Sequence, residues 1–150
     1  MLIVDNSYDF GRNAEINAIS DVSAMGGTPV MALGIVGPPV NVLLFVTVGA
    51  ILPGGLGVCR AAGTPIASDH TIGPVESIDG LVVINLIHPT WVSKNPRVQV
   101  GDVLVLGKPL AAGVLSSALK NKALGAEGYA CMVATATQPN KPGIELSDRA

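Results

Sequence analysis

The charge distribution constrains this chain most, because no charged residue occurs between Asp21 and Arg60. Within that stretch, residues 40–52 form a strongly apolar run. A helix that spans a bilayer needs about 20 such residues, and this run reaches that length only by including a proline and several glycines. All-round apolarity is typical of a helix that is buried on more than one side. We therefore expect residues 39–62 to form a buried or interface helix. A small membrane-associated protein is the alternative, and it depends on residues 40–58 alone.

The composition excludes several classes of protein. Of the 150 residues, 49% are hydrophobic and 13% are charged, which is about half the usual charged fraction. A chain this apolar can bury a core, which excludes disorder as its main state. The net charge of -2 and the lack of a large basic cluster exclude a nucleic-acid partner. Cys59 and Cys131 are too few for a disulfide scaffold, so we expect reduced cysteines and a cytoplasmic protein.

Hydrophobic periodicity and turn residues predict strands that alternate with helices, which favours the α/β or α+β class. Strands are expected at 2–4, 29–36, 80–87 and 99–106, the last interrupted by a turn at Gly101-Asp102. Helices are expected at 12–25, 39–62, 111–123 and 130–137, and loops at 5–11 and 67–73. The first helix should end at Gly26-Gly27, because glycine adopts the left-handed conformation that closes helices. Its buried stripe should consist of Ala14, Ala18, Val22 and Met25, which recur at helical spacing.

A shift in composition divides the chain. It falls at residues 93–100, after which charged residues reach their ordinary frequency. Asn95-Pro96 lies within the shift and is a structure-breaking pair. We therefore expect a boundary near residue 98, with one domain over residues 1–98 and the start of a second over residues 99–150.

Three polar side chains recur in the first predicted helix. Asn13, Asn17 and Asp21 lie at positions i, i+4 and i+8, so they share one face. Carboxylate and amide oxygens are ligands for hard cations such as Mg²⁺. The same spacing also fits an ordinary solvated face opposite the apolar stripe, and spacing alone favours that interpretation.

The second candidate site is the small-residue segment 67–73 (ASDHTIG), which contains Asp69, His70 and Thr71. Small residues allow backbone N–H groups to approach phosphate oxygens. The segment matches neither the P-loop pattern nor the glycine pattern of dinucleotide-binding proteins. Considered alone, it is typical of a simple turn. The two cysteines and two histidines are spaced too widely for the familiar zinc sites.

Several segments together resemble selenophosphate synthetase, the family of selenide, water dikinases. The segment 17–29 (NAISDVSAMGGTP) is very similar to the most specific helix and cap of that family, and the segment 101–110 (GDVLVLGKPL) resembles a later motif. The segments 3–12 (IVDNSYDFGR), 70–72 (HTI) and 80–88 also occur in the family's order. Aminoimidazole ribonucleotide synthetase and thiamine-phosphate kinase share the architecture but match these segments less well.

The resemblance implies an α/β (α+β) protein with an N-terminal domain like that of aminoimidazole ribonucleotide synthetase and the start of a C-terminal domain. It implies a homodimer that binds ATP across both subunits. Asn17 and Asp21 would hold Mg²⁺ on the ATP phosphates, and Asp69, His70 and Thr71 would contact the nucleotide from the partner subunit. The reaction implied converts ATP, selenide and water to selenophosphate, AMP and phosphate. Metal-held charge neutralisation assists such phosphoryl transfer.

The chain also departs from the family. Ser68 and Asp69 stand where the family has two glycines, and Gly73 stands where it has an aspartate. A carboxylate repels phosphate, so we expect weak ATP binding. The family's reactive Cys or Sec and its catalytic Lys precede the part that this chain resembles. We therefore expect a chain truncated at both ends that makes no selenophosphate alone. The alternative is an inactive remnant that acts only through dimerisation.

Overall fold

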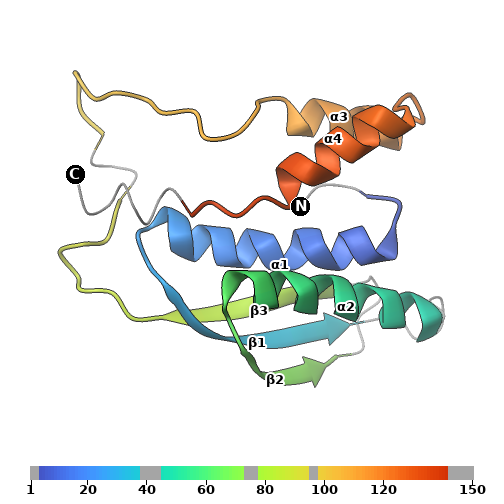
Figure 1. Ribbon diagram of the computed structural model, residues 1–150, viewed down its shortest axis with the longest axis horizontal. Helices are drawn as coiled ribbons and strands as arrows, with labels where there is room; N and C mark the ends of the chain where they lie inside the picture. Colours follow the sequence, from blue (N-terminus) through green and yellow to red (C-terminus); the bar gives the residue numbers. More distant parts are fainter. Residues whose placement is uncertain (1–3, 38–44, 73–77, 95–97, 142–150) are drawn as a thin grey trace.

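The computed structural model describes residues 4–37, 45–72, 78–94 and 98–141. The strands form a mixed sheet in the order β2-β1-β3, with β2 parallel and β3 antiparallel to β1. Figure 1 shows α1 and α2 side by side over one face of this sheet, with α3 and α4 beyond α1. The arrangement confirms the α+β class. The elements are α1 (Ser7–Ala24), β1 (Pro29–Gly37), α2 (Phe45–Ala62), β2 (Ile66–Thr71), β3 (Ile78–Asn85), α3 (Ala112–Lys120) and α4 (Ala126–Ala136).

The helix α1 begins at an asparagine cap. The side-chain oxygen of Asn6 accepts hydrogen bonds from the backbone N–H groups of Tyr8 at 2.8 Å and Asp9 at 3.3 Å. These bonds satisfy donors that the start of a helix otherwise leaves unpaired. Because the helix begins at Ser7, the prediction of a loop over residues 5–11 is wrong for most of that segment.

The end of α1 is the predicted glycine closure. Gly26 has a φ of 83°, and the N–H of Gly27 donates to the carbonyl oxygen of Val22 at 3.0 Å. This is the Schellman arrangement, in which a left-handed residue turns the chain back over the last helical turn. The turn leads into β1, which runs back along α1 (Figure 1).

The buried surface of α1 is wider than the predicted stripe. Met25 of that stripe is 48% exposed, and Ala18 and Val22 are only half-buried. The prediction fails because α1 has neighbours on two sides, with α2 and the sheet on one side and α4 on the other. Its buried residues are Gly11, Asn13, Ala14, Glu15, Ile16, Ile19, Ser20 and Ser23.

Glycines bring the backbones of α1 and α2 into contact. A Cβ atom at Gly11 would overlap the carbonyl oxygen of Ile51, and one at Gly54 would overlap the carbonyl oxygen of Tyr8. Only a residue without a side chain allows a second backbone to approach this closely. These two glycines therefore set how closely α2 packs against α1.

In its described range Phe45–Ala62, α2 is buried along one side only. Ile51 is 4% exposed, whereas Leu52 and Val46 are 46% and 81% exposed. The prediction of burial on more than one side is therefore wrong for this part, and residues 39–44 of the predicted helix lie outside the described residues. Within the described ranges, no helix combines the length and apolarity that a membrane crossing requires.

Helices cover one face of the sheet, and the other face is exposed. Val82 of β3 pairs with Leu33 of β1, and Ile84 pairs with Met31. Directly paired residues lie on the same face, and Met31, Val82 and Ile84 are 36%, 51% and 38% exposed. The predicted strand 29–36 is confirmed, but its burial is limited to alternate positions such as Ala32.

Two predicted strands are not found. Of the predicted strand 2–4 only Val4 is described, and it lies outside any strand. Residues 99–106 are predicted as a strand but adopt no regular structure, and Val103 and Leu104 are 85% and 89% exposed. A strand needs a partner for its backbone hydrogen bonds, and no other described segment pairs with residues 99–106.

The last two helices confirm the predicted ones with shifted ends, and α4 packs on α1 through polar contacts. The Tyr129 hydroxyl donates to Asp9 at 3.0 Å, and the Arg12 guanidinium donates to Thr137 at 3.0 Å. Arg12 also forms an ion pair with Asp9 at 3.0 Å. The C-terminal helices are therefore held to the first turns of α1.

Candidate functional site

The three polar residues that are predicted to share a face of α1 differ in burial. Asn13 is 2% exposed, whereas Asn17 and Asp21 are exposed to solvent. The Nδ2 atom of Asn17 donates to the backbone carbonyl oxygen of Asn13 at 2.7 Å. A cation at this place would therefore meet the amide oxygen of Asn17 and the carboxylate of Asp21. Asp21 lies in the last turn of α1, where the helix dipole favours positive charge.

The predicted nucleotide-contacting residues Asp69, His70 and Thr71 lie in β2, and all three are exposed. The prediction of a loop over residues 67–73 is wrong for residues 67–71, because this segment pairs with β1. β2 forms one edge of the sheet, so one side of its backbone is open.

Within one chain, the two predicted groups lie at opposite ends of the sheet. Residues 69–71 pair with residues 34–36 at the end of β1. Asp21 lies in the last turn of α1, which leads into the start of β1. Figure 1 shows the last turn of α1 near the end of the sheet where β1 begins and the arrowhead of β2 toward the other end. The structure therefore does not bring the two groups together in a single chain.

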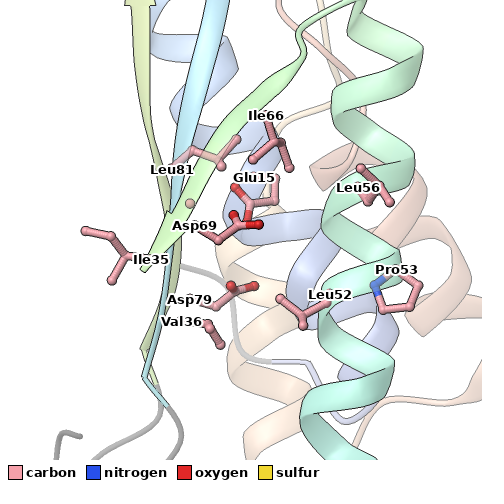
Figure 2. Close-up of a pocket in the computed structure, with 11 residues that line it drawn as sticks. Glu15, Ile35, Val36, Leu52, Pro53, Leu56, Ile66, Asp69, Asp79 and Leu81 are labelled. Carbon is pink, nitrogen blue, oxygen red and sulfur yellow. The ribbon is translucent and has the colours of Figure 1, made fainter. Parts of the chain in front are cut away.

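A cavity of about 230 Å³ lies between α2 and the sheet (Figure 2). Three carboxylates enter it from three different elements: Glu15 from α1, Asp69 from β2 and Asp79 from β3. Leu52, Pro53 and Leu56 of α2 form one wall, and Val36, Ile66 and Leu81 of the sheet line the other. The cavity is thus an apolar space with an acidic cluster between its two walls.

The three acidic residues of the cavity differ in their exposure to solvent. Glu15 is 5% exposed, Asp79 is half-buried and Asp69 is exposed. Among the described residues, no group hydrogen-bonds to Oε2 of Glu15 or to Oδ2 of Asp79, and both atoms are buried. No basic side chain is among the described residues that line the cavity. Buried oxygens without a donor are costly, so they require a compensating group.

A bulge in β2 directs Asp69 into the cavity. Ala32 pairs with Ile66, but the next residue, Leu33, pairs with Ser68, which leaves Ala67 as an extra residue. Successive side chains of a regular strand point to opposite faces, so Ile66 and Asp69, three positions apart, would face opposite ways. The extra residue reverses this alternation. Both residues therefore line the same cavity.

The carboxyl groups have raised pKa values. Burial raises the pKa of Glu15 from 4.5 to about 8, and the charges of Asp79 and Asp69 raise it further. Burial and the charge of Asp69 raise the pKa of Asp79 from 3.8 to about 6, against a lowering by a backbone hydrogen bond from Gly80. Burial and the same three acids raise the pKa of the Cys59 thiol to about 11, so it stays protonated and unreactive at neutral pH.

Sequence reasoning misses Glu15 and Asp79, although each carries a positional signal. Glu15 lies four residues from both Gly11 and Ile19, which are buried on α1. Asp79 lies two residues before Leu81, so both point to the same face of β3. In the described part of the chain, no group of three or more His, Cys, Asp or Glu side chains is placed to hold a metal ion.

Comparison with known proteins identifies the family. Residues 1–87 match the family model described as AIR synthase related protein, N-terminal domain. The chain is 56% identical over 147 residues to the selenide, water dikinase of Burkholderia orbicola (strain MC0-3), and 57% identical over 147 residues to that of Dechloromonas aromatica (strain RCB). It is 48% identical over the same length to the selenide, water dikinase of Rhizobium meliloti (strain 1021).

Each of these alignments covers 98% of this chain but 42% of the relative. The chain thus spans about two fifths of the length of these selenide, water dikinases, and its match to the family model covers more than half of its own length. The chain therefore belongs to the family of AIR synthase related proteins and matches their N-terminal domain.

Proposed function

We propose that this chain forms part of a selenide, water dikinase, which converts ATP, selenide and water to selenophosphate, AMP and phosphate. The observation that carries the proposal is the identity of 56% to a protein of that name, maintained over 98% of the chain. The N-terminal match over residues 1–87 supports a domain boundary near residue 98. On this proposal, residues 1–98 form most of the first domain and residues 99–150 begin the second.

Asp21 and Asn17 are the residues that we propose to hold Mg²⁺ on the ATP phosphates. Both side chains are exposed and one helical turn apart, and they offer the hard oxygen donors that this ion prefers. Mg²⁺ usually keeps several waters and takes only one or two protein carboxylates beside the substrate phosphates, so two protein donors are enough. When bound, the ion neutralises phosphate charge. The role of Asp21 is to hold that positive charge at the end of α1.

We also propose that Asp69, His70 and Thr71 contact the nucleotide held by a partner subunit. Within one chain these residues lie far along the sheet from Asp21. A second copy of the chain resolves this separation, because it can bring its β2 to the other chain's α1. The uncovered sheet face, with Met31, Val82 and Ile84 exposed, is an apolar surface that such a copy can cover.

The function is tested in a hybrid enzyme, in which this chain replaces the matching 147 residues of the Burkholderia orbicola relative. We expect the hybrid to release AMP in a selenide-dependent manner. Asp21→Asn should lower that rate about 100-fold, because a charged ligand to the phosphate-bound metal is lost. The rate is measured by chromatography of AMP in the presence of Mg²⁺.

The matched control is Glu127→Gln, which removes a carboxylate from an exposed position in the first turn of α4. It should leave the rate unchanged. The proposal fails if a folded hybrid releases no AMP with selenide, and the role of Asp21 fails if Asp21→Asn and Glu127→Gln have equal rates.

The proposed dimer gives a separate prediction. Val82→Lys places a charge on the uncovered sheet face and should convert a dimer of the chain to a monomer at micromolar concentration. Val114→Lys places the same charge on α3 at a residue that is 68% exposed, and it should leave the dimer intact. Sedimentation equilibrium measures both masses. A compact monomer of the unaltered chain at that concentration would rule out the dimer.

A further inference from the structure

The cavity between α2 and the sheet is separate from Asn17 and Asp21, which are proposed to bind the metal, but it shares Asp69 with the residues proposed to contact the nucleotide. Its lining indicates a ligand of its own. Three carboxylates converge there, yet no lysine or arginine among the described residues lines it. Leu52 and Leu56 on the α2 side are 46% and 38% exposed, and Asp69 is exposed as well. The cavity therefore opens to solvent between α2 and β2 and is closed at Glu15.

The observation that points to a ligand is the state of Glu15. Its side chain is 5% exposed, and its Oε2 atom is buried without a hydrogen-bond partner among the described residues. Figure 2 shows the Glu15 carboxylate directed into the cavity toward that of Asp69, with Asp79 beside them. The buried Oδ2 atom of Asp79 also lacks a donor. Two buried acceptor atoms in the same cavity therefore lack a donor among the described residues.

Glycines make the room for this arrangement. A Cβ atom at Gly55 would lie 2.5 Å from Cγ of Glu15, and one at Gly34 would overlap Oδ1 of Asp69. The two carboxylates therefore lie against bare backbone of α2 and β1. Because neither glycine carries a side chain, both carboxylates can turn into the cavity rather than away from it.

We propose that this cavity binds a small primary alkylammonium ion, with its ammonium group among Glu15, Asp69 and Asp79 and its hydrocarbon chain against Leu52 and Leu56. A primary ammonium carries three N–H donors, one for each carboxylate. A short alkyl chain matches the apolar walls and gains from leaving water. The volume of about 230 Å³ is below that of most sites for drug-sized ligands, which limits the ligand to a small molecule.

An inorganic cation fits the cavity less well. Mg²⁺ requires convergent oxygen ligands in near-octahedral geometry, and no three acidic side chains in the described ranges are placed to hold a metal. Such an ion would also leave the leucine walls without a partner. An ammonium ion tolerates more spread between its acceptors, because each hydrogen bond is made by a separate N–H group.

The experiment is a titration of the 150-residue chain with n-butylammonium chloride, followed by ¹H–¹⁵N NMR against sodium chloride of equal ionic strength. We expect a dissociation constant in the millimolar range, as befits so small a ligand, and chemical-shift changes at the cavity residues. n-Butanol has the same chain without the charge, and tetramethylammonium has the charge without N–H donors. Both should bind at least about tenfold more weakly.

Substitutions of the acidic residues test whether n-butylammonium binds in the cavity. Glu15→Gln keeps the shape of the side chain but cannot ionise. Above about pH 8, where Glu15 of the unaltered chain carries its charge, the variant should weaken n-butylammonium binding about tenfold or more. Asp69→Asn should weaken it less, because Asp69 is exposed and its charge is screened by solvent. Glu127→Gln, at an exposed position of α4, should leave the affinity unchanged.

Several results would overturn the proposal: equal affinity for n-butanol, unchanged affinity in Glu15→Gln, tighter binding of Mg²⁺ at the same residues, or no chemical-shift change in the cavity. The titration contains neither ATP nor selenide. Its failure therefore leaves the proposed dikinase function untouched, and failure of the hybrid enzyme leaves this proposal untouched.

Discussion

Gly54→Ala is expected to destabilise the fold by about 3 kcal/mol. The added Cβ would overlap the backbone carbonyl oxygen of Tyr8, which belongs to the first turn of α1. A side chain could rotate away from such an overlap, but a helix backbone cannot. α1 and α2 must therefore move apart, which weakens the contacts along their whole interface. The free energy of unfolding is measured by urea denaturation followed by circular dichroism.

Gly49→Ala is the matched control, because Gly49 lies in the same helix and its added Cβ would meet nothing within 4 Å. Alanine has a higher helix propensity than glycine, so this variant should be more stable by up to about 1 kcal/mol. Although the two substitutions are chemically identical, their effects on the free energy of unfolding should have opposite signs. Equal stabilities would show that the helices are not in backbone contact at Gly54.

The free energy of unfolding is expected to fall as pH rises from about 5 to about 9. The folded state raises the pKa of Glu15 from 4.5 to about 8 and that of Asp79 from 3.8 to about 6. Between the unfolded and folded values, the folded state binds more protons than the unfolded state. Stability is therefore highest below the unfolded pKa values and is lost as pH rises through the folded ones. Most acidic groups in proteins act in the opposite direction.

The expected size of the loss is large. A tenfold change in proton affinity corresponds to about 1.4 kcal/mol, so the shift of the Glu15 pKa from 4.5 to about 8 corresponds to about 5 kcal/mol in full. About 4 kcal/mol of this is lost between pH 5 and pH 9. That is a substantial part of the 5–15 kcal/mol that is roughly typical of a folded domain. Urea denaturation at several pH values measures the profile.

Glu15→Gln should flatten most of this profile. The variant cannot ionise at that position, so its stability should exceed that of the unaltered chain above about pH 8 and differ little below about pH 5. Glu127→Gln, at an exposed position, should retain the original profile. A free energy of unfolding that is constant or rises between these pH values would contradict the burial of Glu15 as an acid without a partner.

The helices and the first helix end are predictable because their signals are local. Gly26-Gly27 closes α1 by its own backbone conformation, whatever packs nearby. The start of α1 is equally local, but the sequence predicts a loop there, because Asn6 is as typical of a loop as of a helix cap. The family resemblance identifies the domain from segments such as 17–29, and the match over residues 1–87 confirms it.

The acidic cavity depends on contacts between distant parts of the chain, which no local pattern reveals. Glu15 and Asp79 are far apart in sequence and meet only because β3 pairs with β1 under α1. The failure at residues 99–106 has the same origin, since a run of apolar residues predicts a strand but cannot supply its partner. Asn17 and Asp21 stay predicted ligands, because their exposure fits both a metal site and a solvated helix face.

The bulge at Ala67 sets how β2 is aligned with β1. With Ala67 in the bulge, Asp69 lies opposite Gly34 and faces the helices. If Ala67 instead took its own place in the ladder, Asp69 would turn outward, and Ser68 and His70 would turn inward. A slip of one residue would then exchange a negative charge for a hydroxyl and an imidazole without any substitution. In an edge strand, which has only one neighbour to hold it, the chemistry of the interior is thus decided by alignment as much as by residue identity.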